Sequence, residues 1–225
     1  MLTSVLILVS PAFQVREVFV HGNSRVNEAD ILTRLNISRT NNILLLNTDA
    51  ARERVMGNLL IGDVTFRRDL PGHLHVTVHE RRPSAYVQHT GNFLVLDEFG
   101  RVIEIRPQIR EALPLLEGLQ FTRVQLGEVL EVENETDFVT VVQYTQLLTF
   151  HNLIHRIDHI NVSDPTNIRI LVDYTEFHMG SGVADADMKV RTIVAVLDQR
   201  PDPNIRRGIF RMKTINSDFF FELIQ

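Results

Sequence analysis

The segment His73–His79 alternates strictly between apolar and polar side chains, and this alternation restricts the possible folds more than any other feature of the chain. Leu74, Val76 and Val78 fall on one face, whereas three histidines and a threonine fall on the other. A period of two residues predicts a β-strand with one face buried in a core. Because such a strand needs neighbouring strands and a layer that covers its apolar face, we expect an α+β fold.

The residues around this strand predict a small unit with the order strand, helix, helix, strand, strand. The tight turn Leu70-Pro71-Gly72 precedes the alternating strand. The other expected elements are a strand at 14–21, a helix at 26–35, a helix capped by Thr48 and a strand at 64–69. Two helices over one face of a three-stranded sheet account for the chain up to about Arg82.

A second region begins at Pro83, and its pattern predicts a mixed β-domain with two main helices. One helix is expected at 136–151 with Thr136 as its cap, and the other at 185–199. Leu113–Leu119 is expected to be a loop with buried leucines. The expected strands are 84–88, 93–97, 101–105, 157–162, 168–174, 177–180, 208–213 and 218–224.

Composition excludes several classes of function. The 225 residues contain no cysteine, which excludes disulfides, thiolate nucleophiles and iron–sulfur clusters. The net charge is −5 with both signs interspersed, which argues against a dedicated nucleic-acid binder, because such a protein needs a basic face. The sequence also has no glycine-rich phosphate loop and no nucleophile elbow, so we expect neither a cofactor nor catalysis.

The first ten residues, Met1–Ser10, are apolar but cover only about half of the roughly 20 residues that span a bilayer. The run lacks the basic start of a signal peptide. It is either the outer end of a transmembrane helix or a buried strand or frayed terminus.

One stretch resembles a known family. The residues Leu70-Pro71, the alternating strand, Glu80-Arg81, Pro83 and Ala85 are followed by Phe93–Asp97 and Gly100–Ile103. Together with Val18–Asn23 upstream, they resemble the POTRA domain and the start of the β-domain of the FtsQ/DivIB cell-division proteins. Downstream, Leu113-Pro114, Gly118-Leu119 and Lys189 also resemble that family, although the last third does so more weakly. The domains expected from the resemblance are 1–12 as a partial membrane anchor, 13–82 as the POTRA domain (β-α-α-β-β) and 83–225 as the β-domain.

The resemblance implies a non-catalytic scaffold of the division septum. Proteins of this family are single-pass proteins of the inner or plasma membrane with their bulk outside the cytoplasm, and they recruit FtsB/DivIC-like and FtsL-like partners. The chain departs from the family pattern because the usual cytoplasmic tail and complete membrane helix are missing from it. The resemblance itself favours interpreting Met1–Ser10 as the outer end of a membrane helix, whereas this departure bears against an anchor in this chain and leaves the expected ectodomain unaffected.

The junction between the two expected domains carries Glu80-Arg81 and Pro83. An ion pair there, next to a proline that restricts the preceding residue, would fix the angle between the domains. The simpler alternative is an ordinary surface pair worth less than about 1 kcal/mol.

The C-terminal run Asp218–Ile224 is strongly β-prone and is expected to be an edge strand. Side chains alternate along a strand, so three consecutive phenylalanines cannot all face one core. A partner strand added to this edge would pair its backbone and cover its aromatic surface, and the resemblance implies that the partner binds here. The alternative is that helices of the same domain cover both faces. The expected partner-binding residues are Ile209, Arg211, Lys213, Phe219, Phe220, Phe221 and Leu223.

Two other functions compete with the scaffold. The first is an envelope transport or assembly module. Such a protein is expected to carry several POTRA units and many amphipathic membrane strands, and the sequence pattern predicts neither. The second is a metal-dependent hydrolase that uses His73, His75 and His79. Only His73 and His75 are adjacent on that face, and the sequence fixes no third ligand, so we expect a solvated polar face and no metal site.

Overall fold

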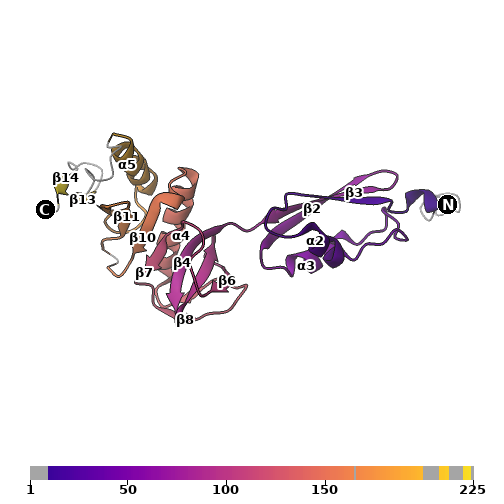
Figure 1. Ribbon diagram of the computed structural model, residues 1–225, viewed down its shortest axis with the longest axis horizontal. Helices are drawn as coiled ribbons and strands as arrows, with labels where there is room; N and C mark the ends of the chain where they lie inside the picture. The colour runs from indigo at the N-terminus through magenta and orange to yellow at the C-terminus, as the bar shows by residue number, and fades with distance from the viewer. Residues whose placement is uncertain (1–9, 165, 200–207, 213–219, 224–225) are drawn as a thin grey trace. The chain divides into compact units, whose positions relative to one another are not determined.

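The computed structural model divides the chain into two compact units, Met1–Arg82 and Pro83–Gln225. It describes residues 10–164, 166–199, 208–212 and 220–223. Figure 1 colours the chain from indigo at the N-terminus to yellow at the C-terminus. Each unit has its own helices and its own main sheet, and each is described separately below.

The first unit is a three-stranded sheet with two helices, in the order that the sequence predicts. Its elements are the 3-10 turn η1 (Pro11–Phe13), β1 (Glu17–His21), α2 (Glu28–Leu35), α3 (Thr48–Met56), β2 (Ile61–Asp69) and β3 (His73–Glu80). The sheet order is β1-β3-β2, in which β3 runs parallel to β1 and antiparallel to β2. The alternating strand is therefore the central one, which explains why its pattern is so regular.

The core of the first unit lies between the sheet and the two helices. Leu74, Val76 and Val78 of β3 are fully buried, as are Ile31 of α2 and Val55 of α3. At roughly 25 cal/mol per Å² of apolar surface, each of these side chains contributes about 1.5–3 kcal/mol when buried. The predicted cap of the second helix is wrong: the N-cap is Asn47, whose Oδ1 accepts a hydrogen bond from the N–H of Ala50. Asparagine is at least as good an N-cap as threonine.

The second unit is built on a nine-stranded mixed sheet in the order β14-β13-β12-β11-β10-β7-β4-β5-β6. Its strands are β4 (Pro83–His89), β5 (Asn92–Asp97), β6 (Val102–Arg106), β7 (Leu115–Glu117), β10 (Ile157–Asn161), β11 (Arg169–Val172), β12 (Thr175–His178), β13 (Gly208–Arg211) and β14 (Phe220–Leu223). The two short strands β8 (Phe121–Arg123) and β9 (Glu131–Val132) pair separately. The helices are α4 (Glu135–Phe150), the 3-10 turn η2 (Ile154–Arg156) and α5 (Ala186–Gln199). The expected α+β class, with a strand at the sheet edge near the C-terminus, is confirmed.

The expectation that Leu113–Leu119 is only a loop is wrong, because its middle forms β7 in the interior of the sheet. β7 pairs in parallel with β4 on one side and with β10 on the other. With three residues it is the shortest strand of this sheet, too short to show an alternating pattern in the sequence.

Helix α4 packs its buried side chains, among them Phe138, Tyr144 and Leu148, into the core of the second unit. Gly100, in the turn between β5 and β6, lies directly beneath it. Gly100 has φ of 77°, and a Cβ atom there would lie 2.4 Å from Phe138 Cζ. Only glycine therefore satisfies both the turn and the close packing of the helix. The predicted Thr136 cap is also wrong, since the N-cap is Asn134.

Candidate partner-binding edge

The predicted docking region lies at one end of the nine-stranded sheet. β13 pairs in parallel with β12 and antiparallel with β14, with Phe210 opposite Phe221 and Arg211 opposite Phe220. The parallel pairing requires a crossover connection between β12 and β13, and α5 lies within that connection. The C-terminal strand is thereby placed at the margin of the sheet (Figure 1).

β13 is anchored to the core through one of its two faces. Phe210 is buried, and its ring lies 5.6 Å from the ring of Phe177 in β12. Ile209 is half-buried and Arg211 is exposed, as expected for the opposite face of a strand. Burying the phenylalanine therefore fixes the register of β13, because a shift by one residue would move Phe210 out of the core.

The orientation of the backbone groups of β14 follows from one hydrogen bond. The N–H of Met212, just after β13, donates to the carbonyl oxygen of His178 in β12 at 2.8 Å. Because successive residues of a strand point their N–H and C=O groups to opposite sides, residues 209 and 211 face β14. Their register partners Glu222 and Phe220 then face β13. We infer that the N–H and C=O groups of Phe221 and Leu223 point away from the sheet.

No strand in the described part of the chain pairs with this outer side of β14. A row of backbone donors and acceptors at a sheet margin is a template for strand addition. The edge can therefore accept an extended peptide through main-chain hydrogen bonds, which do not depend on the identity of the side chains.

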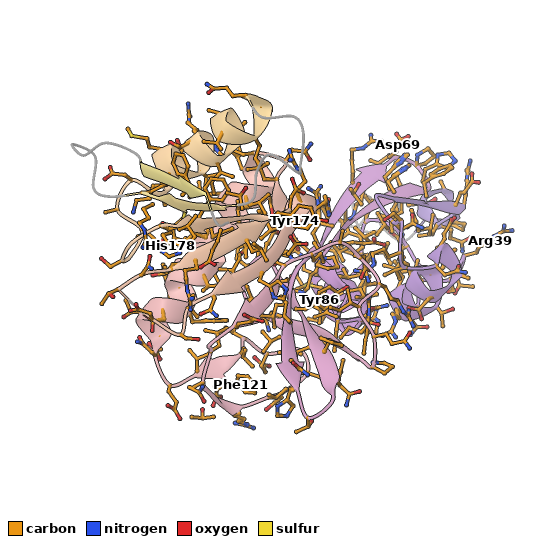
Figure 2. The ribbon with its side chains drawn as sticks, turned by 60° about the vertical axis from the view of Figure 1, so that its left-hand side comes forward. Arg39, Asp69, Tyr86, Phe121, Tyr174 and His178 are labelled. Atoms are coloured by element: carbon orange, nitrogen blue, oxygen red, sulfur yellow. The ribbon has the colours of Figure 1, made fainter. Side chains whose placement is uncertain are left out.

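Beside the edge, β12 and its neighbours present a polar surface. His178 Nε2 lies 3.0 Å from Glu176 Oε1, and His178 Nδ1 lies 3.0 Å from Asn167 Nδ2. Figure 2 shows His178 on this part of the sheet. Glu176 is also 3.8 Å from Arg169 of β11. Since Ile209 is the register partner of Glu176, the half-buried side of β13 adjoins this hydrogen-bonded surface.

The sequence-predicted edge residues are only partly within the described structure. Ile209 and Arg211 lie in β13, and Phe220, Phe221 and Leu223 lie in β14. Lys213 and Phe219 lie outside the described residues. The docking role of all seven stays a prediction.

At the predicted hinge, Glu80 has an extensive set of hydrogen bonds within the first unit. Its carboxylate accepts the backbone N–H groups of Ser24, Arg25 and Val26 at 2.8–3.0 Å, and the Ser24 hydroxyl at 3.1 Å. Partial burial raises the pKa of Glu80, but the bonds from Val26, Arg25 and Ser24 outweigh it and lower the pKa below its usual value. Glu80 thus holds the loop before α2, residues 24–26, at the end of β3. We call this set of hydrogen bonds the Glu80 clamp.

The other two hinge residues continue the backbone pairing on either side of the junction. The N–H of Arg81 donates to the carbonyl oxygen of Leu60, and Pro83 begins β4. The hinge role of Glu80, Arg81 and Pro83 stays a prediction.

The histidine-bearing face of β3 has a neighbour that sequence reasoning missed. His21 of β1 stacks on His75 with ring centroids 5.4 Å apart, and their nearest ring nitrogens are 3.1 Å apart. Phe19 stacks on the same imidazole at 4.9 Å. The parallel pairing of β1 with β3 brings these residues together, and that pairing is not readable from local sequence. Among the residues that the structure describes, no three metal-ligating side chains form a site.

The described residues also contain no helix that is both long and apolar enough to cross a membrane.

Comparison with known proteins places the sequence beside cell-division proteins. The domain family described as "POTRA domain, FtsQ-type" matches residues 13–81. The cell division protein DivIB of Clostridium tetani is 23% identical over 193 residues, which are 85% of this chain and 72% of the relative. The DivIB of Clostridium acetobutylicum is 29% identical over 54% of this chain and 49% of its own length.

Other relatives carry the name FtsQ. The cell division protein FtsQ of Bradyrhizobium diazoefficiens is 30% identical over 48% of this chain and 32% of its own length. The chain thus spans half or less of two of these three relatives. A solved structure of the extracytoplasmic domain of DivIB from Geobacillus stearothermophilus aligns with a TM-score of 0.34 and 17% identity, over 54% of this chain and 97% of that domain.

Proposed function

Because the chain belongs to the FtsQ/DivIB family of cell-division proteins, we propose that it is a non-catalytic scaffold that recruits FtsB/DivIC-like and FtsL-like partners to the septum. A role in cell division is what the family establishes. The proposed recruitment of these partners is supported by the position of β14 at the margin of the nine-stranded sheet. A scaffold of this kind acts by offering backbone hydrogen bonds, and it makes or breaks no covalent bond.

The same proposal assigns a role to each part of the chain. In this proposal, residues 1–12, of which 1–9 lie outside the described residues, are a partial membrane-anchor segment. Residues 13–82 are a POTRA domain next to the membrane, and residues 83–225 are a β-domain that presents the docking edge outside the cytoplasm. Three observations support this division: the FtsQ-type match over 13–81, the boundary between Arg82 and Pro83, and the separate sheets of the two units.

Proline at Phe221 tests the docking edge. The N–H of Phe221 points away from the sheet, so proline removes an outward donor and keeps the β13–β14 bonds, as expected for the positions where edge strands tolerate proline. We expect the Phe221→Pro chain to bind the ectodomain of its FtsB/DivIC-like partner about 10- to 100-fold more weakly in isothermal titration calorimetry. The basis is the loss of one hydrogen bond and the steric block of the added strand.

Two matched variants separate the backbone from the side chain. Phe221→Ala keeps the N–H and is expected to bind more tightly than Phe221→Pro. Glu222→Pro removes a donor that faces β13, so it is expected to detach β14 as well. If Phe221→Pro binds the partner with the affinity of the unaltered chain, the docking site lies elsewhere.

A further inference from the structure

Helix α4 exposes a long face that carries no charged side chain. Val139, Gln143, Gln146, Leu147 and Phe150 follow the spacing i, i+4, i+7, i+8, i+11, which places them along one side of a helix. The only charged residues of α4 are in its first turn. Val139 is 53% exposed and Phe150 is 78% exposed. An exposed helix face in a soluble protein is normally polar or charged.

The opposite face of α4 is already used for the core. Phe138, Val141, Tyr144 and Leu148 are buried against the rest of the unit. An uncharged helix face that carries exposed side chains such as Val139 and Phe150 is expected to be covered as well. Among the described residues, the Gln146 amide of the outer face donates to the carbonyl oxygen of Glu98, whereas Val139 and Phe150 remain largely exposed.

The uncovered face forms one wall of a groove, and the start of α5 with the residues before it forms the other. The groove has a volume of about 690 Å³, and its apolar lining comes from Leu147, Phe150, Val183 and Ala186. The helices α4 and α5 contact each other. The walls are side chains of helices and not a strand edge, so the groove suits a helix and not an added strand.

The charges that line this groove are acidic. Its charged lining residues are Asp185 and Asp187. Hydrogen bonds from His151 and Arg191 hold the pKa of Asp187 below its usual value, so the carboxylate stays ionised at neutral pH. Asp187 is already paired with Arg191 at 2.8 Å, so a basic group on an occupant would meet the Asp185 carboxylate beside this ion pair at one end of the groove.

We propose that the α4–α5 groove binds an amphipathic helix of a partner protein, with apolar side chains against Leu147 and Phe150 and lysine or arginine beside Asp185 and Asp187. The α4 wall of the groove, from Gln143 to Phe150, is about 11 Å long at 1.5 Å per residue, which matches about two turns of such a helix. This groove is separate from the β14 edge, so the inference does not rest on strand addition there.

Fluorescence anisotropy with labelled helical peptides tests the groove. The first probe is a peptide of about 16 residues with leucines at i, i+3, i+4 and i+7 and lysines along one flank. The second has the same leucines with glutamates on that flank. We expect the full chain to bind the lysine peptide at least about tenfold more tightly than the glutamate peptide, with the difference reduced at high salt. Equal binding of the two peptides, or no binding of the lysine peptide, would overturn the proposal.

Point variants locate the binding on the protein. Phe150→Asp is expected to weaken binding of the lysine peptide about tenfold or more, because Phe150 lines the groove. Its side chain is 78% exposed, so the fold is expected to remain, as circular dichroism can verify. Leu126→Asp is the matched control, because Leu126 is 48% exposed and does not line the groove. If the control weakens binding as much as Phe150→Asp, the peptide binds outside the groove.

Two further measurements distinguish other occupants. Sedimentation equilibrium of the chain reports whether a second copy covers the face, and flotation with anionic vesicles reports whether lipid does. A dimer that Phe150→Asp dissociates, or vesicle binding that this variant abolishes, contradicts a partner helix as the occupant.

Discussion

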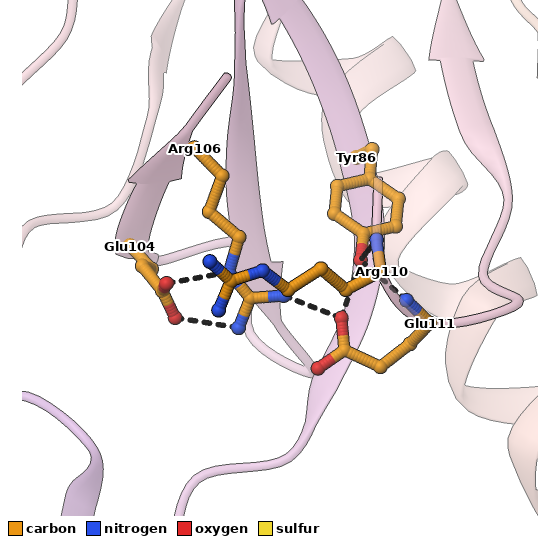
Figure 3. Close-up of polar contacts among 5 residues, drawn as sticks. All are labelled: Tyr86, Glu104, Arg106, Arg110 and Glu111. Carbon is orange, nitrogen blue, oxygen red and sulfur yellow. Dashed lines mark hydrogen bonds and ion pairs between the residues drawn. The ribbon is translucent and has the colours of Figure 1, made fainter. Parts of the chain in front are cut away.

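Replacing Arg106 with alanine is expected to lower the free energy of unfolding of the Pro83–Gln225 unit by about 2–3 kcal/mol, because the two carboxylates that remain are about one third exposed and can regain water. The Arg106 side chain is only 4% exposed, and it lies between the carboxylates of Glu104 and Glu111. Its Nη2 donates to Glu104 at 2.6 Å and its Nη1 donates to Glu111 (Figure 3). The bond to Glu104, followed by the bond to Glu111, raises the pKa of Arg106 against the effect of burial. Removal of the guanidinium would leave two carboxylates side by side without their shared cation.

The same network holds the edge strand β6 to the segment that follows it. The Tyr86 hydroxyl donates to Glu111 at 2.5 Å and accepts the backbone N–H groups of Arg110 and Glu111 (Figure 3). We therefore expect the Arg106→Ala variant to loosen residues 107–114 as well. Hydrogen exchange of the Glu111 amide should be faster in the variant.

Urea unfolding followed by tyrosine fluorescence measures the effect of Arg106→Ala. All three tyrosines of the chain, Tyr86, Tyr144 and Tyr174, lie in the second unit, and there is no tryptophan, so the signal reports that unit alone. Arg123→Ala is the control, because Arg123 and Glu131 are 63% and 60% exposed and 3.8 Å apart. Such a surface pair is worth less than about 1 kcal/mol. A loss at Arg106 no larger than this control would show that the network is not stabilising.

Replacing Glu80 with alanine is expected to destabilise the first unit by about 2–3 kcal/mol. The carboxylate accepts three consecutive backbone N–H groups, and the last of them belongs to Val26, whose side chain is buried. Without Glu80, the loop before α2 loses the acceptor that closes it onto the end of β3. We expect the amides of Arg25 and Val26 to exchange faster in the Glu80→Ala variant, with little change in the second unit.

The Glu80 clamp should also weaken in acid. Its pKa in the folded chain is lower than the usual value of 4.5, so the unfolded chain takes up this proton first as the pH falls. The stabilisation is therefore complete above about pH 5 and is lost progressively as the pH falls below 4.5 and through the lowered pKa. Glu80→Gln cannot titrate, so the difference in stability between it and the unaltered chain should shrink over that range. If the difference in the free energy of unfolding between the two chains stays constant from pH 7 to 3, the ionised carboxylate of Glu80 is not what stabilises the fold.

The elements with a periodic pattern were predictable from the sequence, whereas short elements and partners distant in sequence were not. The alternation of Leu74, Val76 and Val78 correctly identified a half-buried strand, and it proved to be the central one. β7 escaped prediction because three residues contain no measurable period. Both predicted threonine caps were wrong because an asparagine nearby in the sequence could cap the same helix, and the local pattern does not choose between them.

The candidate sites, too, were predictable where a local sequence pattern marks them and were missed where residues distant in sequence come together. The sequence placed a strand at a sheet margin near the C-terminus, because a β-prone run with three phenylalanines has no single buried face. It did not reveal that Glu80 binds the backbone of residues 24–26, since more than 50 residues separate the two. It also did not reveal the α4–α5 groove, because a helix face is recognised as uncovered only after the sheet is found on its other side.

The short strand β7 has a mechanical consequence. It joins the β4-β5-β6 half of the sheet to the half that ends at β14, through the register pairs of only three residues. Within the sheet, tension applied by a binding partner at the β14 margin would have to cross this narrow junction to reach β4, the strand that begins at the boundary between the units. Under load, we expect the two halves of the sheet to separate at β7 before either half unravels.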